Sequence, residues 1–174
     1  GFKPNIPTFC AMASHRRMIV MRHAKSSWVN PLQSDHARPL NEKGRSDAQI
    51  VAKTLDDRGW TPDVVYLSDS ERTRETIQRM RMHMDDTKEF ILSELYQATL
   101  MDVVGALGDS LEGECPMLLG HNPGWEMMVD WLSGSSITMP SGAAVLLERT
   151  VDETLWHEKG TWSFIEMISP RDLL

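Results

Sequence analysis

The sequence predicts an α/β fold, a three-layer αβα sandwich with a mostly parallel central sheet. Short apolar runs typical of buried strands alternate along the chain with segments whose apolar residues recur at helical spacing. Such alternation favours a parallel sheet with helices on both faces. The chain has 174 residues, of which 41% are hydrophobic, so it can build one sizeable core, and it contains no internal repeat.

The first strand and the first helix are predicted from apolar patterns near the start of the domain. Met18–Met21 is a continuous apolar run that Arg22 and His23 follow directly, as in a buried strand that presents polar groups at its end. A helix then begins at Asn41 and ends at Gly59. Its apolar face consists of Ala48, Val51, Ala52 and Leu55.

A second strand, a second helix and a short third strand follow. Residues 63–67 have the pattern of a buried strand, and residues 90–92 that of a short one. Ser68, with Glu71 three residues later, fits a capping box at the start of the intervening helix. The apolar stripe of that helix consists of Ile77, Met80 and Met84.

The later elements repeat this alternation. Apolar spacing predicts a helix over 100–111, and Gly113 follows it. The remaining elements are a strand over 116–119, a helix over 125–132 and two closing strands over 143–147 and 162–167.

Charge and cysteine content argue against several classes of protein. The formal net charge of −7 argues against nucleic acid as a partner, because affinity for its backbone requires many lysines and arginines. No apolar run approaches the roughly 18 residues of a membrane span, so a soluble protein with no membrane partner is expected. The two cysteines, Cys10 and Cys115, are far apart and outside a CxxC spacing, which favours a reducing compartment without a disulfide.

Residues 1–17 are predicted to be an N-terminal tail ahead of a single domain over 18–174. The tail has basic residues but no acidic ones, contains two prolines and has no usable period. It could be the remnant of an organellar transit peptide, which would place the protein in the matrix of a chloroplast or mitochondrion. It could also be an expression remnant ahead of a start at Met12, which leaves the cytoplasm as the alternative.

Polar residues directly follow three of the predicted strands and are candidates for one common site. In open α/β sheets, ligands bind at the carboxyl ends of the strands. The candidates are Arg22 and His23 after the first strand, Ser68 and Arg72 after the second, and His121 and Asn122 after the fourth. Imidazoles and guanidiniums gathered at one sheet edge would form an electropositive pocket in an acidic protein, which predicts a phosphate site.

These residue types suit phosphoryl transfer. Guanidinium is a rigid, permanently charged fork that binds phosphate oxygens bidentately. A neutral imidazole can attack phosphorus through one ring nitrogen if the other is held as an N–H donor, typically to a backbone carbonyl. His23 is the predicted nucleophile and requires such a partner. No carboxylate or thiolate stands at ligand spacing beside His23 or His121, so neither a metal nor another cofactor is expected.

Several segments resemble a known family of phosphatases. Met18-Ile-Val-Met-Arg-His-Ala24 resembles the signature strand of the histidine phosphatase superfamily, whose usual motif is Arg-His-Gly. The SixA-type phosphohistidine phosphatases are similar in further segments, in the same order along the chain: HAKSSW over 23–28, RPLNEKG over 38–44, Ser68 with Arg72 and Thr76, LGHNPG over 119–124, and ISPR over 168–171. The resemblance runs from residue 18 to the end and implies a phosphoglycerate mutase-like fold.

The resemblance also implies roles for individual residues. His23 would be transiently phosphorylated, Arg22 and Arg72 would hold the phosphoryl group, and His121 would stabilise its oxygens. Arg38, in the Arg-Pro-Leu element, would be a further phosphate ligand. Other candidates for substrate binding are Asn122 and Ser68, although helix capping explains Ser68 better. Trp28 could lie at the pocket rim or contact a partner, or could pack within its loop.

Glu94 is the candidate proton donor, although a positioning role explains it better. Ester-cleaving relatives place a carboxylic acid near the leaving oxygen, and SixA-type members generally lack a clear one. A phosphoramidate bond to imidazole needs less help from an acid, because the ring can be protonated before it leaves. The expected substrate is therefore a phosphohistidine protein, with inorganic phosphate as product.

Two alternatives to this function remain open at this stage. One is a phosphomonoesterase or mutase of the same superfamily that acts on a small phosphorylated metabolite. The other is an inactive scaffold that binds phosphorylated partners without hydrolysing them.

Overall fold

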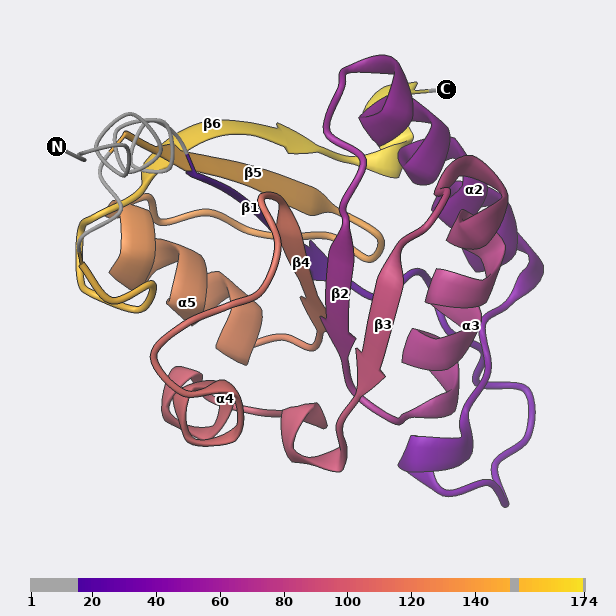
Figure 1. Cartoon of the computed structure of the whole chain (residues 1–174). Coiled ribbons are helices and arrows are strands. Elements are labelled where there is room, and N and C mark those ends of the chain that lie inside the picture. The colour runs from indigo at the N-terminus through magenta and orange to yellow at the C-terminus, as the bar shows by residue number, and fades with distance from the viewer. Residues whose placement is uncertain (1–15, 151–153, 174) are drawn as a thin grey trace, which may run out of the picture.

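A six-stranded sheet forms the centre of the computed structural model, which describes residues 16–150 and 154–173. The strands lie in the order β3-β2-β4-β1-β5-β6 (Figure 1). Their bounds are β1 Arg16–Arg22, β2 Val64–Leu67, β3 Lys88–Ile91, β4 Pro116–Gly120, β5 Ala144–Arg149 and β6 Ser163–Ile168. The first four strands in this order are parallel, and β5 and β6 are antiparallel to their neighbours. This mixed, mostly parallel sheet confirms the predicted fold class.

Helices cover both faces of the sheet. In Figure 1, α2 and α3 lie on one face, and α4 and α5 lie on the other. Their bounds are α2 Glu42–Asp57, α3 Glu71–Met80, α4 Leu100–Leu107 and α5 Gly124–Ser133. Short 3-10 turns are η1 Asp35–Ala37, η2 Arg81–His83, η3 Ser93–Leu95 and η4 Pro170–Leu173.

Strand β1 shows how the central strands feed two separate cores. Because successive side chains of a strand point to opposite faces, Ile19 and Met21 pack into the core under α2 and α3, while Met18 and Val20 pack into the core under α4 and α5. All four side chains are fully buried. A strand that is apolar on both faces is therefore explained by its place between two helical layers.

Two predicted helix boundaries are wrong. The N-cap of α3 is Ser70, whose side chain accepts a hydrogen bond from the Thr73 N–H, and not Ser68. Helix α4 ends at Leu107 rather than at residue 111, because Gly108 adopts a φ of 76° and stops it four residues early. Smaller differences affect β3, which extends over 88–91, and β6, which begins one residue late, at Ser163.

The predicted boundary between tail and domain is also displaced. Arg16 and Arg17 were expected in the tail, but they form the start of β1 and pair with Arg149 and Glu148 of β5. Residues 1–15, and with them Cys10, lie outside the described residues. Within the described part of the chain, none of the helices is both long enough and apolar enough to cross a membrane.

A glycine fixes the position of α5 close to the first turn of α4. A Cβ atom at Gly124, the first residue of α5, would lie 2.0 Å from the backbone oxygen of Ala98. Any larger residue would force these segments apart. Glycine therefore lets α5 begin directly behind the end of β4, three residues after His121.

Candidate active site

A polar cavity of about 350 Å³ opens at the carboxyl ends of the parallel strands. All of the side chains that were predicted to follow the strands line it, except that of Ser68. The lining residues are Arg22, His23, Lys25, Ser26, Trp28, Asp35, Arg38, Arg72, Gln97, His121, Asn122 and Ser141. The cavity thus carries three guanidiniums and one lysine against one carboxylate, and it is electropositive in a chain of net charge −7.

Three neighbouring elements hold the backbone around His23. Its N–H donates to the carbonyl of Gly120 on β4 over 3.0 Å, and its carbonyl accepts from the N–H of Gly142 over 2.8 Å. The N–H of Ala24 donates to Oγ1 of Thr76 on α3 over 3.1 Å. Hydrogen bonds to β4, to the loop before β5 and to α3 therefore hold the end of β1, which fixes where the ring of His23 can lie.

One ring nitrogen of His23 has the backbone partner that a nucleophilic imidazole requires. Nδ1 lies 2.7 Å from the carbonyl oxygen of Ala24, and a carbonyl can only accept, so Nδ1 carries the proton. Nε2 then keeps its lone pair and accepts a hydrogen bond from Nε of Arg72 over 3.3 Å. Burial, the largest cause, and the nearby arginines lower the pKa of His23 to about 4. The imidazole is neutral at pH 7, as a nucleophile must be.

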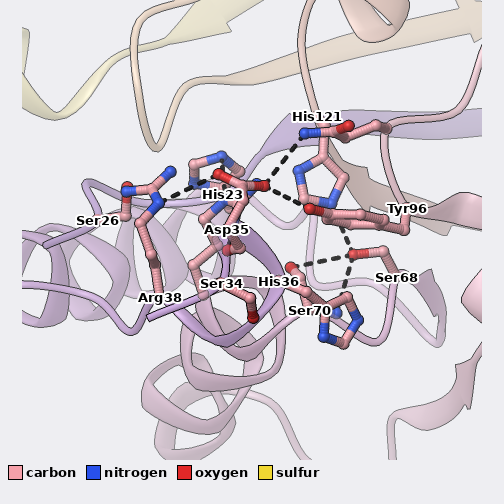
Figure 2. Close-up of polar contacts among 12 residues, drawn as sticks. His23, Ser26, Ser34, Asp35, His36, Arg38, Ser68, Ser70, Tyr96 and His121 are labelled. Carbon is pink, nitrogen blue, oxygen red and sulfur yellow. Dashed lines mark hydrogen bonds and ion pairs between the residues drawn. The ribbon is translucent and has the colours of Figure 1, made fainter. Parts of the chain in front are cut away.

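His121 faces His23 across the cavity and is held by a cluster of hydroxyl groups. The two ring centroids are 5.3 Å apart. Nε2 of His121 lies 2.7 Å from Oγ of Ser68 (Figure 2). The same Oγ also contacts Oγ1 of Thr73 over 2.9 Å. Nδ1 is buried and has no hydrogen-bond partner among the described residues. Burial and the charges of His23 and Arg72 lower the pKa of His121 to about 3.

Arg22 and Asn122 converge on one backbone carbonyl. Nη1 of Arg22 donates to the carbonyl of Met139 over 2.9 Å, and Nδ2 of Asn122 donates to the same oxygen over 3.0 Å. Asn122 also donates to Glu126 over 2.9 Å. Both side chains line the cavity, so the loop before β5 is fastened directly to the site. Nε of Arg22 is buried and has no hydrogen-bond partner within the described chain.

Arg38 lies at the rim of the cavity beneath an exposed tryptophan. Its Nη1 donates to Oγ of Ser26 over 2.7 Å and to the carbonyl of Ser27 over 3.1 Å. Its guanidinium carbon stacks 3.5 Å from the ring centroid of Trp28. Trp28 therefore lies at the pocket rim, one of the positions considered for it from sequence.

Two predicted site residues lie outside the cavity. Ser68 is completely buried and contacts His121 rather than the opening. Glu94 is exposed in η3 and does not line the cavity, so the structure gives no support to a proton-donor role for it.

Sequence reasoning missed Asp35, Tyr96 and Gln97. Asp35 accepts a hydrogen bond from the hydroxyl of Tyr96 (Figure 2). It accepts another from Nη2 of Arg72 over 2.9 Å. The signal that could have found it is its position three residues before Arg38, a spacing at which side chains of one turn meet. No comparable pattern marks Tyr96 or Gln97, which reach the site only through the fold.

The arrangement can bind and transfer an oxyanion. Rigid cationic donors surround a neutral imidazole whose Nε2 lone pair accepts the hydrogen bond from Arg72, and a second neutral imidazole stands opposite. Among the described residues, no group of three or more His, Cys, Asp or Glu side chains is arranged to hold a metal ion.

Comparisons of the sequence with known proteins identify relatives of this chain. The sequence profile described as histidine phosphatase superfamily (branch 1) matches residues 18–116. An uncharacterized chloroplastic protein of Arabidopsis thaliana is 33% identical over 174 aligned residues, which cover 89% of this chain and 78% of that protein.

Solved structures share the fold. The SixA structure from Agrobacterium tumefaciens has a TM-score of 0.77 at 26% identity and is matched over 89% of this chain and 98% of its own. A structure of the protein histidine phosphatase SixA with tungstate has a TM-score of 0.74 at 20% identity, over 91% of this chain and 99% of its own. At that identity the second likeness supports the fold alone.

The family profile spans more than half of the chain and includes β1 from Met18 to Arg22, with His23 directly after it. The chain belongs to branch 1 of the histidine phosphatase superfamily.

Proposed function

We propose that this protein hydrolyses phosphohistidine on a protein substrate through a phosphorylated His23 intermediate. The observation that carries the proposal is the state of the His23 ring, neutral at pH 7, with Nδ1 held by Ala24 and Nε2 directed at Arg72. That ring presents a lone pair to a cavity lined by cations, which is what attack on a phosphoryl group requires.

The reaction would proceed in two displacements. Nε of Arg72 moves its hydrogen bond from Nε2 of His23 to a phosphoryl oxygen, which frees the lone pair of Nε2. Nε2 then forms a bond to phosphorus while the phosphorus–nitrogen bond of the substrate breaks, and the electron pair of that bond goes to the leaving imidazole. Water then attacks the phosphorylated His23 and loses a proton to solvent. The bond between phosphorus and Nε2 breaks, its electrons return to the ring, and inorganic phosphate is released.

The surrounding residues would stabilise the transferring phosphoryl group. Arg72 and Arg22 offer guanidinium N–H groups beside His23, and Arg38 supplies a third positive charge at the rim. The unpartnered Nδ1 of His121 would meet a phosphoryl oxygen. Ser68 is assigned a positioning role through its contact with His121 rather than substrate binding.

An exposed apolar rim supports a protein as the substrate. Trp28 lines the cavity and is 76% exposed, while Val29 and Leu32 in the same loop are 88% and 92% exposed. Large apolar side chains in water beside a polar cavity suit contact with a partner surface. A small phosphorylated metabolite would fill the cavity without needing them.

A substrate comparison tests this function against the phosphomonoesterase or mutase alternative. Purified protein is offered a phosphohistidine-bearing protein, free phosphohistidine and a sugar phosphate. We expect the phosphoprotein to be preferred, and a clear preference for the sugar phosphate would refute the proposal. The rim variant Val29→Ser/Leu32→Ser, which leaves Trp28 stacked on Arg38, should raise the KM for the phosphoprotein but not for free phosphohistidine. A matched control replaces Met101 on α4 and Met127 on α5, which are also exposed.

The scaffold alternative is separated by turnover. The neutral imidazole of His23 and the cationic donors around it support an active enzyme. Binding of phosphate without any turnover would favour the scaffold. The chloroplastic Arabidopsis relative supports an organelle matrix as the compartment, and the location of a fluorescent fusion of the complete gene product in the cell would test it.

A further inference from the structure

A carboxylate is held firmly at the mouth of the cavity. Oδ2 of Asp35 accepts hydrogen bonds from Nη2 of Arg72 over 2.9 Å, from Nε2 of Gln97 over 3.2 Å and from the hydroxyl of Tyr96. Oδ1 accepts from Nε of Arg38 over 3.2 Å. Figure 2 shows the Asp35 side chain between Arg38 and Tyr96, close to His23. Gln97 contributes from a backbone φ of 50°, which non-glycine residues seldom adopt.

The carboxylate lies on the outward side of the predicted nucleophile. The guanidinium of Arg72 turns its Nε edge to His23, and its Nη1 and Nη2 atoms bind the backbone oxygen and the carboxylate of Asp35 over 2.7 and 2.9 Å. His23 is 6% exposed, whereas the Asp35 side chain is 41% exposed. In phosphoryl transfer the leaving group departs roughly opposite the nucleophile, here toward the mouth and therefore toward Asp35.

The charge of Asp35 restricts what can leave on that side. Burial acts to raise its pKa, but the hydrogen bonds from Tyr96 and Arg72 outweigh this effect and lower the pKa to about 2. An ionised carboxylate cannot protonate the oxygen of a departing alcohol, and it repels an anionic leaving group. It can accept a hydrogen bond, and an imidazole leaving group carries a second ring nitrogen whose N–H can donate one.

Building on the proposed function, we propose that Asp35 accepts a hydrogen bond from the unphosphorylated ring nitrogen of the substrate and thereby selects phosphohistidine over phosphate esters. The carboxylate holds the substrate ring in its protonated, cationic form. As Nε2 of His23 bonds to phosphorus, the substrate's phosphorus–nitrogen bond breaks and its electron pair neutralises the ring. Neutral imidazole departs with its N–H still on Asp35, and no proton has to reach the leaving nitrogen.

The Asp35→Asn variant tests this role with two small substrates that do not depend on the apolar rim. Phosphoimidazole offers the ring N–H, whereas 4-nitrophenyl phosphate has no such donor and releases a stable anion. We expect kcat/KM for phosphoimidazole to fall about 10- to 100-fold, the range for a hydrogen bond to a charged group. For 4-nitrophenyl phosphate kcat/KM should rise, because the charge that repels the departing nitrophenolate is gone. Asp69→Asn is the matched control, since Asp69 pairs with His36 and does not line the cavity.

The outcomes separate this role from a structural one. A parallel loss of both activities would mean that Asp35 only holds Arg72, and no change in either would leave it without a role; both results overturn the inference. If thermal unfolding shows that the Asp35→Asn protein is not folded, Asp35→Glu replaces it. That variant should lower the ratio of kcat/KM for phosphoimidazole to kcat/KM for 4-nitrophenyl phosphate. An unchanged ratio would contradict the inference. Turnover that survives in His23→Ala would instead defeat the proposed function itself.

Discussion

Arg72 donates a hydrogen bond from Nε to Nε2 of His23 over 3.3 Å, so a guanidinium covers the lone pair that this imidazole presents to the cavity. Arg72 is held by α3 on one side and by Asp35 on the other, and it is 3% exposed. A phosphoryl group that reaches His23 therefore meets a preorganised charge at the point of attack.

The Arg72→Lys variant should lose kcat by about 10²- to 10³-fold, the usual cost of removing one preorganised donor. Lysine keeps the charge but not the fork that reaches His23 and Asp35 together. Steady-state kinetics with phosphoimidazole measures the effect. Arg74→Lys is the control, because Arg74 is exposed on the same helix; a loss at Arg72 no larger than at Arg74 would contradict this account.

The ring of His23 should remain neutral and protonated on Nδ1 as the pH falls from 7 to near 4. Burial and the arginine charges lower its pKa to about 4, and the Ala24 carbonyl fixes the tautomer. An NMR titration of the ring nitrogens, assigned by comparison with His23→Gln, measures both properties. Titration near 6.5, the ordinary value for histidine, would show that the ring is not desolvated as described.

The free energy of unfolding should fall as the pH drops from about 6.5 to about 4. In this window the unfolded chain protonates its histidines, while His23 and His121, with pKa values lowered to about 4 and 3, stay neutral in the folded state. The unfolded state then binds more protons, so acid favours unfolding. Urea unfolding at several pH values tests this, and His121→Gln should flatten the slope. A slope unaffected by His121→Gln would be inconsistent with a buried neutral ring.

Ser68→Ala and Ser70→Ala should act on different quantities. Loss of Oγ at Ser68 leaves Nε2 of the buried His121 without its closest partner, so kcat should fall about tenfold, as for the loss of about 1–2 kcal/mol of hydrogen bonding. Loss of the N-cap at Ser70 should lower the free energy of unfolding by about 1 kcal/mol. Kinetics and urea unfolding of both variants provide the test, which fails if Ser68→Ala retains the full kcat.

Gly124→Ala and Gly105→Ala should change stability in opposite directions. The added Cβ at Gly124 would lie 2.0 Å from the Ala98 carbonyl, so we expect a loss of about 1–3 kcal/mol. Gly105 is exposed within α4 with nothing within 4 Å of an added Cβ, so alanine should stabilise by about 0.5–1 kcal/mol. A stable Gly124→Ala protein would show that α4 and α5 do not approach as described.

The fold was predictable because each strand and helix has its own local pattern of apolar residues. The apolar runs at β1 and β4 and the periodic stripe of α2 follow directly from burial between two helical layers. Boundaries that depend on one residue's geometry were harder. Ser68 and Ser70 are both plausible caps, and the choice depends on which hydroxyl the fold directs at His121.

The site was predictable only in part, for a related reason. His23, Arg72 and His121 follow strands, so sheet topology brings them together. Asp35 begins the short turn η1 and Tyr96 follows the short turn η3, and no periodicity places either residue. They meet because η1 packs against α3 and the hydroxyl of Tyr96 reaches the Asp35 carboxylate. Glu94 was considered on sequence proximity alone, and the turn of η3 directs it to solvent while Tyr96 points inward.

Trapping the phosphoenzyme tests the central claim most directly. Protein mixed for milliseconds with a radiolabelled phosphohistidine protein and quenched in alkali should carry acid-labile label on His23, located by peptide mapping, and His23→Ala should carry none. Rapid release of phosphate with no label on His23, or label retained in His23→Ala, would contradict nucleophilic attack by this imidazole.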